Sequence, residues 1–198
     1  MLQLLRQYFD IAFLMGKPQD LPGGDHQMKI GIGLALLTYI MALAVPYGLG
    51  QAFLQAVIDL LFTGAIFLIA LILMGRRSRF EQAFGGFCGA SAFINLAALP
   101  LFNLRPERVD TAGFTLTDLA DLVLLVWGIS LLAHVIKHTF EVNRVLSVVI
   151  SFLYLMVLSS LMAAVVNRSQ PSVSAHSNSH YVSVLLTTSQ TEQLVSLV

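Results

Sequence analysis

Four polar residues stand inside otherwise apolar stretches of this sequence, and their side chains have the chemistry to bind a proton or a cation. They are Asp59, Asn95, Asp118 and Asp121. Ionisable groups at membrane depth are costly, and they tend to mark ion paths or paired contacts. Asp118 and Asp121 are three residues apart, so they face one way on a helix. One interpretation therefore makes Asp59, together with Asp118 or Asp121, a proton or cation site.

The alternative interpretation of the same residues is structural. Asp118 then caps a helix near the membrane surface, and Asp59 bonds within the helix bundle in its neutral form. Asn95 is expected to bond to a neighbouring helix, because a buried amide needs partners. Arg105 and Arg108, in the adjoining loop, are placed within reach of the acidic residues.

Other combinations of reactive side chains are weaker. His134 and His138 are four residues apart and Glu141 follows three later, but a zinc site needs three or four ligands, so no metal site is predicted. Cys88 is the single cysteine and lies in an apolar run, where a small hydrophobic role is expected. The serines of the last apolar stretch form no Ser-His-Asp arrangement. No catalytic residue and no cofactor is predicted.

The composition places these residues in a membrane protein. The chain has 198 residues, of which 57% are hydrophobic and only 11% are charged. A soluble domain carries about 25% charged residues, so lipid must cover much of this surface. The net charge is zero and no long basic run is present, which argues against nucleic acid as a partner.

Five stretches have the length and apolarity of membrane-spanning helices, which need about 20 mostly apolar residues. They cover approximately residues 28–47, 52–75, 80–102, 115–137 and 142–166. The sequence therefore predicts an all-α, polytopic membrane bundle of five transmembrane helices. It divides the chain into three regions: an N-terminal region 1–27, a membrane domain 28–166 and a polar C-terminal tail 167–198.

The N-terminal region predicts an amphipathic helix that lies on the membrane interface. Gln3, Arg6, Gln7 and Asp10 share one face at spacings of three and four, and leucines and phenylalanines cover the rest. The alternative is a helix packed on other protein. A turn-rich linker, "KPQDLPGGD", comes next in the chain.

Basic residues predict the orientation, because Lys and Arg concentrate in short cytoplasmic loops. With the N-terminus inside, the cytoplasmic side collects eight of them, and the dense run "GRRSR" is among these. The other side collects three. An odd number of spans then places the C-terminal tail outside, in the periplasm of a bacterial inner membrane. Part of that tail, "HYVSVLLTT", has strand propensity.

Small residues mark the helix faces expected to pack closely. Gly85 and Gly89 form a Gly-x-x-x-Gly pair in the third span, and Gly31 with Ala35 offers a similar patch in the first. A phosphate-binding loop is excluded here, because no Gly-Lys-Ser/Thr ending is present. Packing within the chain is favoured over self-association.

These features resemble the Yip family of five-span membrane proteins, and specifically its short bacterial members. The resemblance rests on "RFEQAFGGFCGASAFINLAALP", "LADLVLLVWGISLLAHVIKH" and "EVNRVLSVVISFLYLMVLSSLMAAV", and on "GKPQDLP" near the N-terminus. It covers about residues 28–166. It implies a non-enzymatic integral membrane protein with a cytoplasmic N-terminus and a role in membrane organisation or complex assembly.

Three functions are compatible with the sequence. The first is an accessory, scaffold or assembly subunit that contacts membrane lipids and either other integral membrane proteins or copies of itself. The second is a small proton- or cation-coupled transporter that uses Asp59, Asn95, Asp118 and Asp121. The third is a membrane enzyme that uses the histidine face of the fourth span.

Overall fold

The computed structural model describes residues 1–103 and 115–169. The chain divides into two compact units, Met1–Ser159 and Ser160–Val198. The first unit holds five complete helices and most of the sixth, whereas the described part of the second is the end of that sixth helix. Arg105, Arg108 and the stretch of the C-terminal tail with strand propensity lie outside the described residues.

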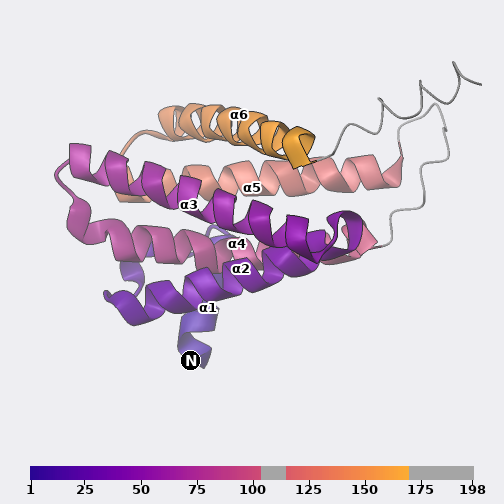
Figure 1. Ribbon diagram of the computed structural model, residues 1–198. Helices are drawn as coiled ribbons and strands as arrows, with labels where there is room; N and C mark the ends of the chain where they lie inside the picture. Colours follow the sequence, from indigo (N-terminus) through magenta and orange to yellow (C-terminus); the bar gives the residue numbers. More distant parts are fainter. Residues whose placement is uncertain (104–114, 170–198) are drawn as a thin grey trace, which may run out of the picture. The chain divides into compact units, whose positions relative to one another are not determined.

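Six α-helices make up the described chain, and no strand is found among the described residues. Five are long and apolar enough to cross a membrane, which confirms the predicted five-span all-α fold. The short N-terminal helix is also present, and the second to fifth helices run side by side (Figure 1). Their bounds are α1 Leu2–Ala12, α2 Asp25–Tyr47, α3 Leu49–Leu73, α4 Phe80–Asn103, α5 Leu116–Phe140 and α6 Arg144–Ser169.

Glycines stand just beyond the ends of the second and third helices. Gly48 has a φ of 80° and is the single residue between α2 and α3, and Gly75 has a φ of 67° shortly after α3. A side chain disfavours these left-handed angles, whereas glycine adopts them freely. The chain can therefore reverse between α2 and α3 within one residue, and these two helices form a tight hairpin.

Helix α4 is the centre of the bundle, and α2 makes the most extensive contact with it. The two backbones touch at Gly31, where an added Cβ would lie 2.4 Å from the carbonyl oxygen of Gly85. A Cβ on Gly85 would lie 2.8 Å from the Cα of Met28. In lipid, such close approach provides the van der Waals contact that holds helices together.

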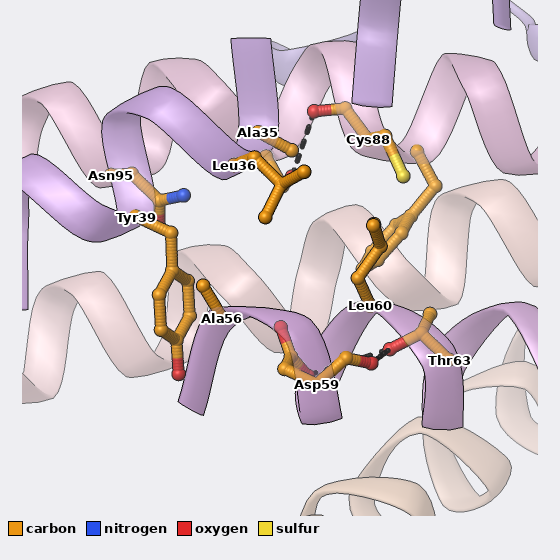
Figure 2. Close-up of a pocket in the computed structure, with 11 residues that line it drawn as sticks. Ala35, Leu36, Tyr39, Ala56, Asp59, Leu60, Thr63, Cys88 and Asn95 are labelled. Carbon is orange, nitrogen blue, oxygen red and sulfur yellow. Dashed lines mark hydrogen bonds between the residues drawn. The ribbon is translucent and has the colours of Figure 1, made fainter. Parts of the chain in front are cut away.

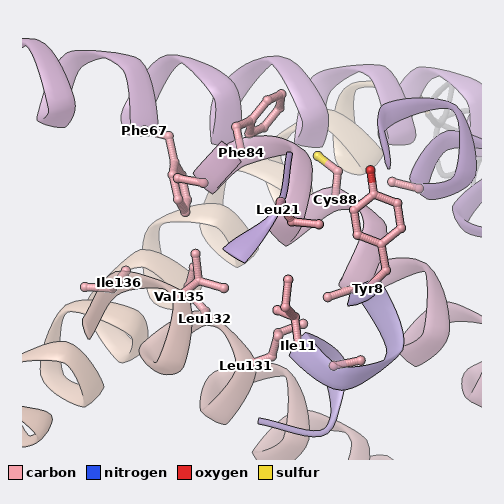
Figure 3. Packing of buried hydrophobic residues seen from close by; sticks show 14 of the residues in the cluster. Tyr8, Ile11, Leu21, Phe67, Phe84, Cys88, Leu131, Leu132, Val135 and Ile136 are labelled. Atoms are coloured by element: carbon pink, nitrogen blue, oxygen red, sulfur yellow. The ribbon is translucent and has the colours of Figure 1, made fainter. Parts of the chain in front are cut away.

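Helix α1 packs on the same glycine-rich face of α4. The ring of Tyr8 covers Gly89, and the Tyr8 hydroxyl donates a hydrogen bond to the carbonyl of Gln27 at 2.5 Å. Tyr8 and Ile11 are buried in the main hydrophobic cluster, which continues through Cys88 to α5 (Figure 3). The opposite edge of α1 exposes large apolar residues, among them Leu2 and Phe9. The amphipathic helix therefore has a protein-facing edge and an outward apolar edge.

Salt bridges join the α3–α4 connection to the α5–α6 connection at one end of the bundle. Arg76 and Arg79, between α3 and α4, each bind the carboxylate of Glu141 at 2.8 Å. Glu141 directly follows α5 and has a left-handed φ of 57°. The two guanidinium groups hold the pKa of this exposed carboxyl below its usual range. This basic end also contains the starts of α2, α4 and α6.

Candidate intramembrane binding site

Asp59 lies close to the middle of its helix. It is ten residues after Leu49 and fourteen before Leu73, the two ends of α3. At 1.5 Å per residue, about 15 Å of helix separate it from the start. A residue at that position in a membrane-spanning helix lies in the hydrocarbon region, where an unpaired carboxylate has no water to solvate it.

A pocket of about 80 Å³ opens beside Asp59 between α2, α3 and α4. Tyr39 reaches into it from α2, and Asn95 and Ser91 line it from α4. Figure 2 shows Tyr39, Asp59 and Asn95 projecting from these three helices into the same space. The rest of the wall is largely apolar, so the polar groups are concentrated at one place.

A second pocket, of about 170 Å³, lies on the other side of Asp59 between α3, α4, α5 and α6. Tyr154 and Ser151 line it from α6. Four residues line both pockets, and they mark the place where the two pockets adjoin: Asp59, Phe87, Ser91 and Asn95.

Hydrogen bonds around Asp59 leave its carboxylate weakly satisfied. The Thr63 hydroxyl donates to the Asp59 main-chain carbonyl at 2.7 Å, whereas the Asp59 Oδ1 atom is 3.4 Å from the same hydroxyl. Thr63 has one hydroxyl proton, so the Tyr154 hydroxyl, 2.5 Å away, is the donor in their bond. No ion pair between Asp59 and a basic residue is found in the described part of the chain.

Two amides lie near the carboxylate. Asn95 donates a long hydrogen bond of 3.4 Å to the Thr38 hydroxyl of α2, so it does contact a neighbouring helix. Gln55 lies one turn before Asp59 on α3, and its buried Nε2 atom has no hydrogen-bond partner among the described residues. Buried amide donors normally have partners. Gln55 therefore has unused hydrogen-bonding capacity one turn from Asp59.

Asp118 and Asp121 are placed elsewhere. Asp118 is in the first turn of α5, where its carboxylate accepts hydrogen bonds from the Thr115 main-chain N–H at 2.8 Å and from the Thr115 hydroxyl at 2.7 Å. This is the capping role of the structural interpretation. Asp121 follows one turn later. Neither residue is among those that line the two pockets around Asp59, although Asn95 is.

The histidine face of α5 is used for packing. His134 Nε2 bonds to the carbonyl of Gly16 at 2.7 Å, and because a carbonyl only accepts, this nitrogen carries the proton. The His138 ring lies 4.5 Å from that of His134. No group of three His, Cys, Asp or Glu side chains suited to a metal ion is found within residues 1–103 and 115–169. Cys88 is buried in the hydrophobic cluster.

Sequence reasoning missed the hydroxyl groups of this site, chiefly Thr63 and Tyr154. The four-residue spacing of Asp59 and Thr63 was a usable signal, since such residues share a helix face. Tyr154 gave no signal, because its role depends on which face of α6 meets α3. Comparison of the chain with protein-family models, with curated proteins and with solved structures finds no match.

Proposed function

We propose that this protein is a non-enzymatic membrane protein that binds a proton or a small cation at Asp59 and couples that binding to transport. The observation that carries the proposal is that Asp59, Ser91 and Asn95 line both pockets, so one polar site adjoins spaces on two sides of the α3–α4 pair. Ionisable residues inside membrane helices commonly mark ion or proton pathways.

The side chains at the site suit this task. A carboxylate, an amide oxygen and hydroxyl oxygens are hard ligands of the kind that alkali and alkaline-earth cations prefer. Protonation or cation binding neutralises Asp59, which removes the cost of a bare charge in hydrocarbon. Transport would follow from the difference between the neutral and charged states of this residue.

We further propose that the basic end of the bundle faces the cytoplasm of a bacterial inner membrane. The contact of Arg76 and Arg79 with Glu141 groups the arginine-rich α3–α4 connection with the α5–α6 connection, which Lys137 and Arg144 flank, at that end. Positive charge in short loops favours the cytoplasmic side. The N-terminus would then be cytoplasmic and the C-terminal tail periplasmic.

Flux through proteoliposomes tests the transport proposal. We expect the wild type to dissipate an imposed proton or sodium gradient faster than empty vesicles, and the Asp59→Asn variant to lose most of this activity. Asp25→Asn is the matched control, because Asp25 is an exposed acid paired with Lys29 at the start of α2. Equal flux in wild type, Asp59→Asn and empty vesicles would overturn transport.

A second candidate is an accessory or assembly subunit of a membrane complex, the role that the Yip resemblance implies. The observation in its favour is α6, which buries only Ser147 and Ser151 between Arg144 and Ser159 and turns a broad apolar face outward. The small residues of α2 and α4, by contrast, are used within the chain. Co-purification of a stoichiometric membrane partner in mild detergent would favour this candidate, and a monomer without partners would count against it.

A further inference from the structure

A further pocket, which several charged and polar side chains help to line, lies at the basic end of the bundle, away from Asp59. It has a volume of about 530 Å³ and is formed where the last turns of α5 meet the first turns of α6 and the residues after α1. Lys137 and His138 line it from α5, Arg144 lines it from α6, and His134 adds a further ring. Leu14 and Val148 give it an apolar side.

The cations of this pocket have no anionic partner among the described residues. Lys137 and Arg144 form none of the ion pairs found there. Glu141, the acid nearest to them in sequence, is occupied by Arg76 and Arg79. Two uncompensated positive charges therefore face one pocket.

Neighbouring charges do not change this balance. Lys17 and Asp20, from the segment after α1, both act on the His138 ring, and their charges oppose each other. His134 directs its Nε2 atom to the Gly16 carbonyl, which leaves Nδ1 as its remaining polar atom. The pocket keeps a net positive character from Lys137 and Arg144.

The position of the pocket decides which anion fits. Lys137 and His138 are in the last turn of α5 and Arg144 begins α6, so these groups lie at the depth of lipid headgroups. Basic pockets between helices at a membrane surface bind phosphate-containing headgroups, while an adjacent apolar wall accepts the start of the acyl chains. The planar guanidinium of an arginine donates hydrogen bonds to phosphate oxygens in fixed directions, and the flexible side chain of a lysine brings an ammonium group to the same oxygens.

We propose that this pocket binds the phosphate of an anionic phospholipid headgroup, with Lys137 and Arg144 as its charged ligands. The proposal is independent of Asp59 and of transport. It assigns a ligand to the histidine-bearing end of α5, for which no metal site is predicted.

Native mass spectrometry of the full-length protein with added lipid tests the assignment. We expect wild type to retain phosphatidylglycerol more strongly than phosphatidylcholine. The Lys137→Gln/Arg144→Gln variant should bind phosphatidylglycerol about tenfold or more weakly, given the contribution of a basic side chain near an anionic membrane surface. Lys29→Gln/Arg77→Gln is the matched control, because it removes two charges from the same end outside the pocket.

Each outcome of this experiment has a distinct meaning. If wild type retains both lipids to the same extent, the proposal is wrong. This comparison uses wild type alone, so it holds even if a variant fails to fold. Equal losses in the two double variants would also overturn it, because the effect would then be general charge. If millimolar inorganic phosphate displaces phosphatidylglycerol, the ligand of the pocket is a soluble phosphate compound. The proposal of a lipid ligand would then be wrong.

Discussion

Gly31 of α2 lies directly against the main-chain carbonyl of Gly85 in α4, so close that a Cβ on Gly31 would approach that oxygen to 2.4 Å. Tyr8 fills the next space along α4, over Gly89. The small-residue faces are therefore occupied inside the chain. They fix how α1, α2 and α4 hold together, and α4 in turn carries Ser91 and Asn95 to the site.

Replacement of Gly31 by alanine should destabilise the bundle. The new methyl group would meet backbone, which cannot rotate away, so we expect a loss of about 1–3 kcal/mol, as for other overpacked positions. Gly33→Ala is the control, because a Cβ there meets nothing within 4 Å. Thermal unfolding in detergent measures both. Equal midpoints for the two variants would show that α2 and α4 are farther apart than described.

Tyr8 makes the stability of the folded protein depend on pH in the alkaline range. Burial is the main cause that raises the Tyr8 pKa from 10.0 to about 12. The folded state thus favours the neutral phenol, and the stability that Tyr8 contributes is complete below about pH 10 and is lost as pH rises towards about 12. Tyr8→Phe should lower stability by about 1 kcal/mol near neutral pH through the lost hydrogen bond.

The difference between wild type and Tyr8→Phe should then shrink above pH 10. Tyr47→Phe serves as the control, since Tyr47 is 51% exposed at the end of α2. Chemical unfolding at several pH values gives both comparisons. A difference that stays constant from about pH 8 to about pH 12 would contradict the buried position of the phenol.

Glu141 makes the stability depend on pH in the acidic range, and with the opposite sign. Its hydrogen bonds to Arg79 and Arg76 lower its pKa, so its stabilising contribution is present above the unfolded pKa and is lost as pH falls through the lower folded value. We expect Glu141→Gln to melt at a slightly lower temperature at neutral pH and at the wild-type temperature under strongly acidic conditions. Arg77→Gln, a change outside this ion pair, should melt like wild type at both.

The proposed orientation predicts which helix ends an impermeant thiol reagent reaches. In a Cys88→Ser background, Ser78→Cys should react only after the cytoplasmic side is exposed, because Ser78 lies among the arginines of the α3–α4 connection. Leu116→Cys, 83% exposed at the start of α5, should react from outside in intact cells. Labelling of both from the same side would contradict the five-span arrangement.

The helices could be predicted from the sequence because length and apolarity suffice to identify a span. The predicted spans begin and end within three residues of the observed helices, and the amphipathic segment at the N-terminus is a helix as expected. Gly31 and Gly85 could also be predicted to lie at close contacts between helices, because only small residues permit such contacts.

The site was harder to predict, because its geometry depends on helix rotation and depth. One interpretation of the sequence grouped Asp59 with Asp118 or Asp121 in a single proton or cation site. In the structure Asp59 is near the midpoint of α3, whereas Asp118 caps the first turn of α5. Thr63 and Tyr154 meet only because a particular face of α6 is turned towards α3, and α6 is apolar nearly all round. Periodicity cannot fix that face.

Carbodiimide labelling tests whether the Asp59 carboxyl group takes up and releases a proton or a cation inside the membrane. This exchange is the basis of the proposed transport. A hydrophobic carbodiimide reacts with protonated carboxyl groups in the hydrocarbon region, and peptide mass spectrometry locates the adduct. We predict modification of Asp59 in the native protein, lost in Asp59→Asn, and reduced either by raising the pH or by adding the cation that binds. Native protein that is unmodified at Asp59, or modified to an extent that neither pH nor cations change, would contradict this role of Asp59.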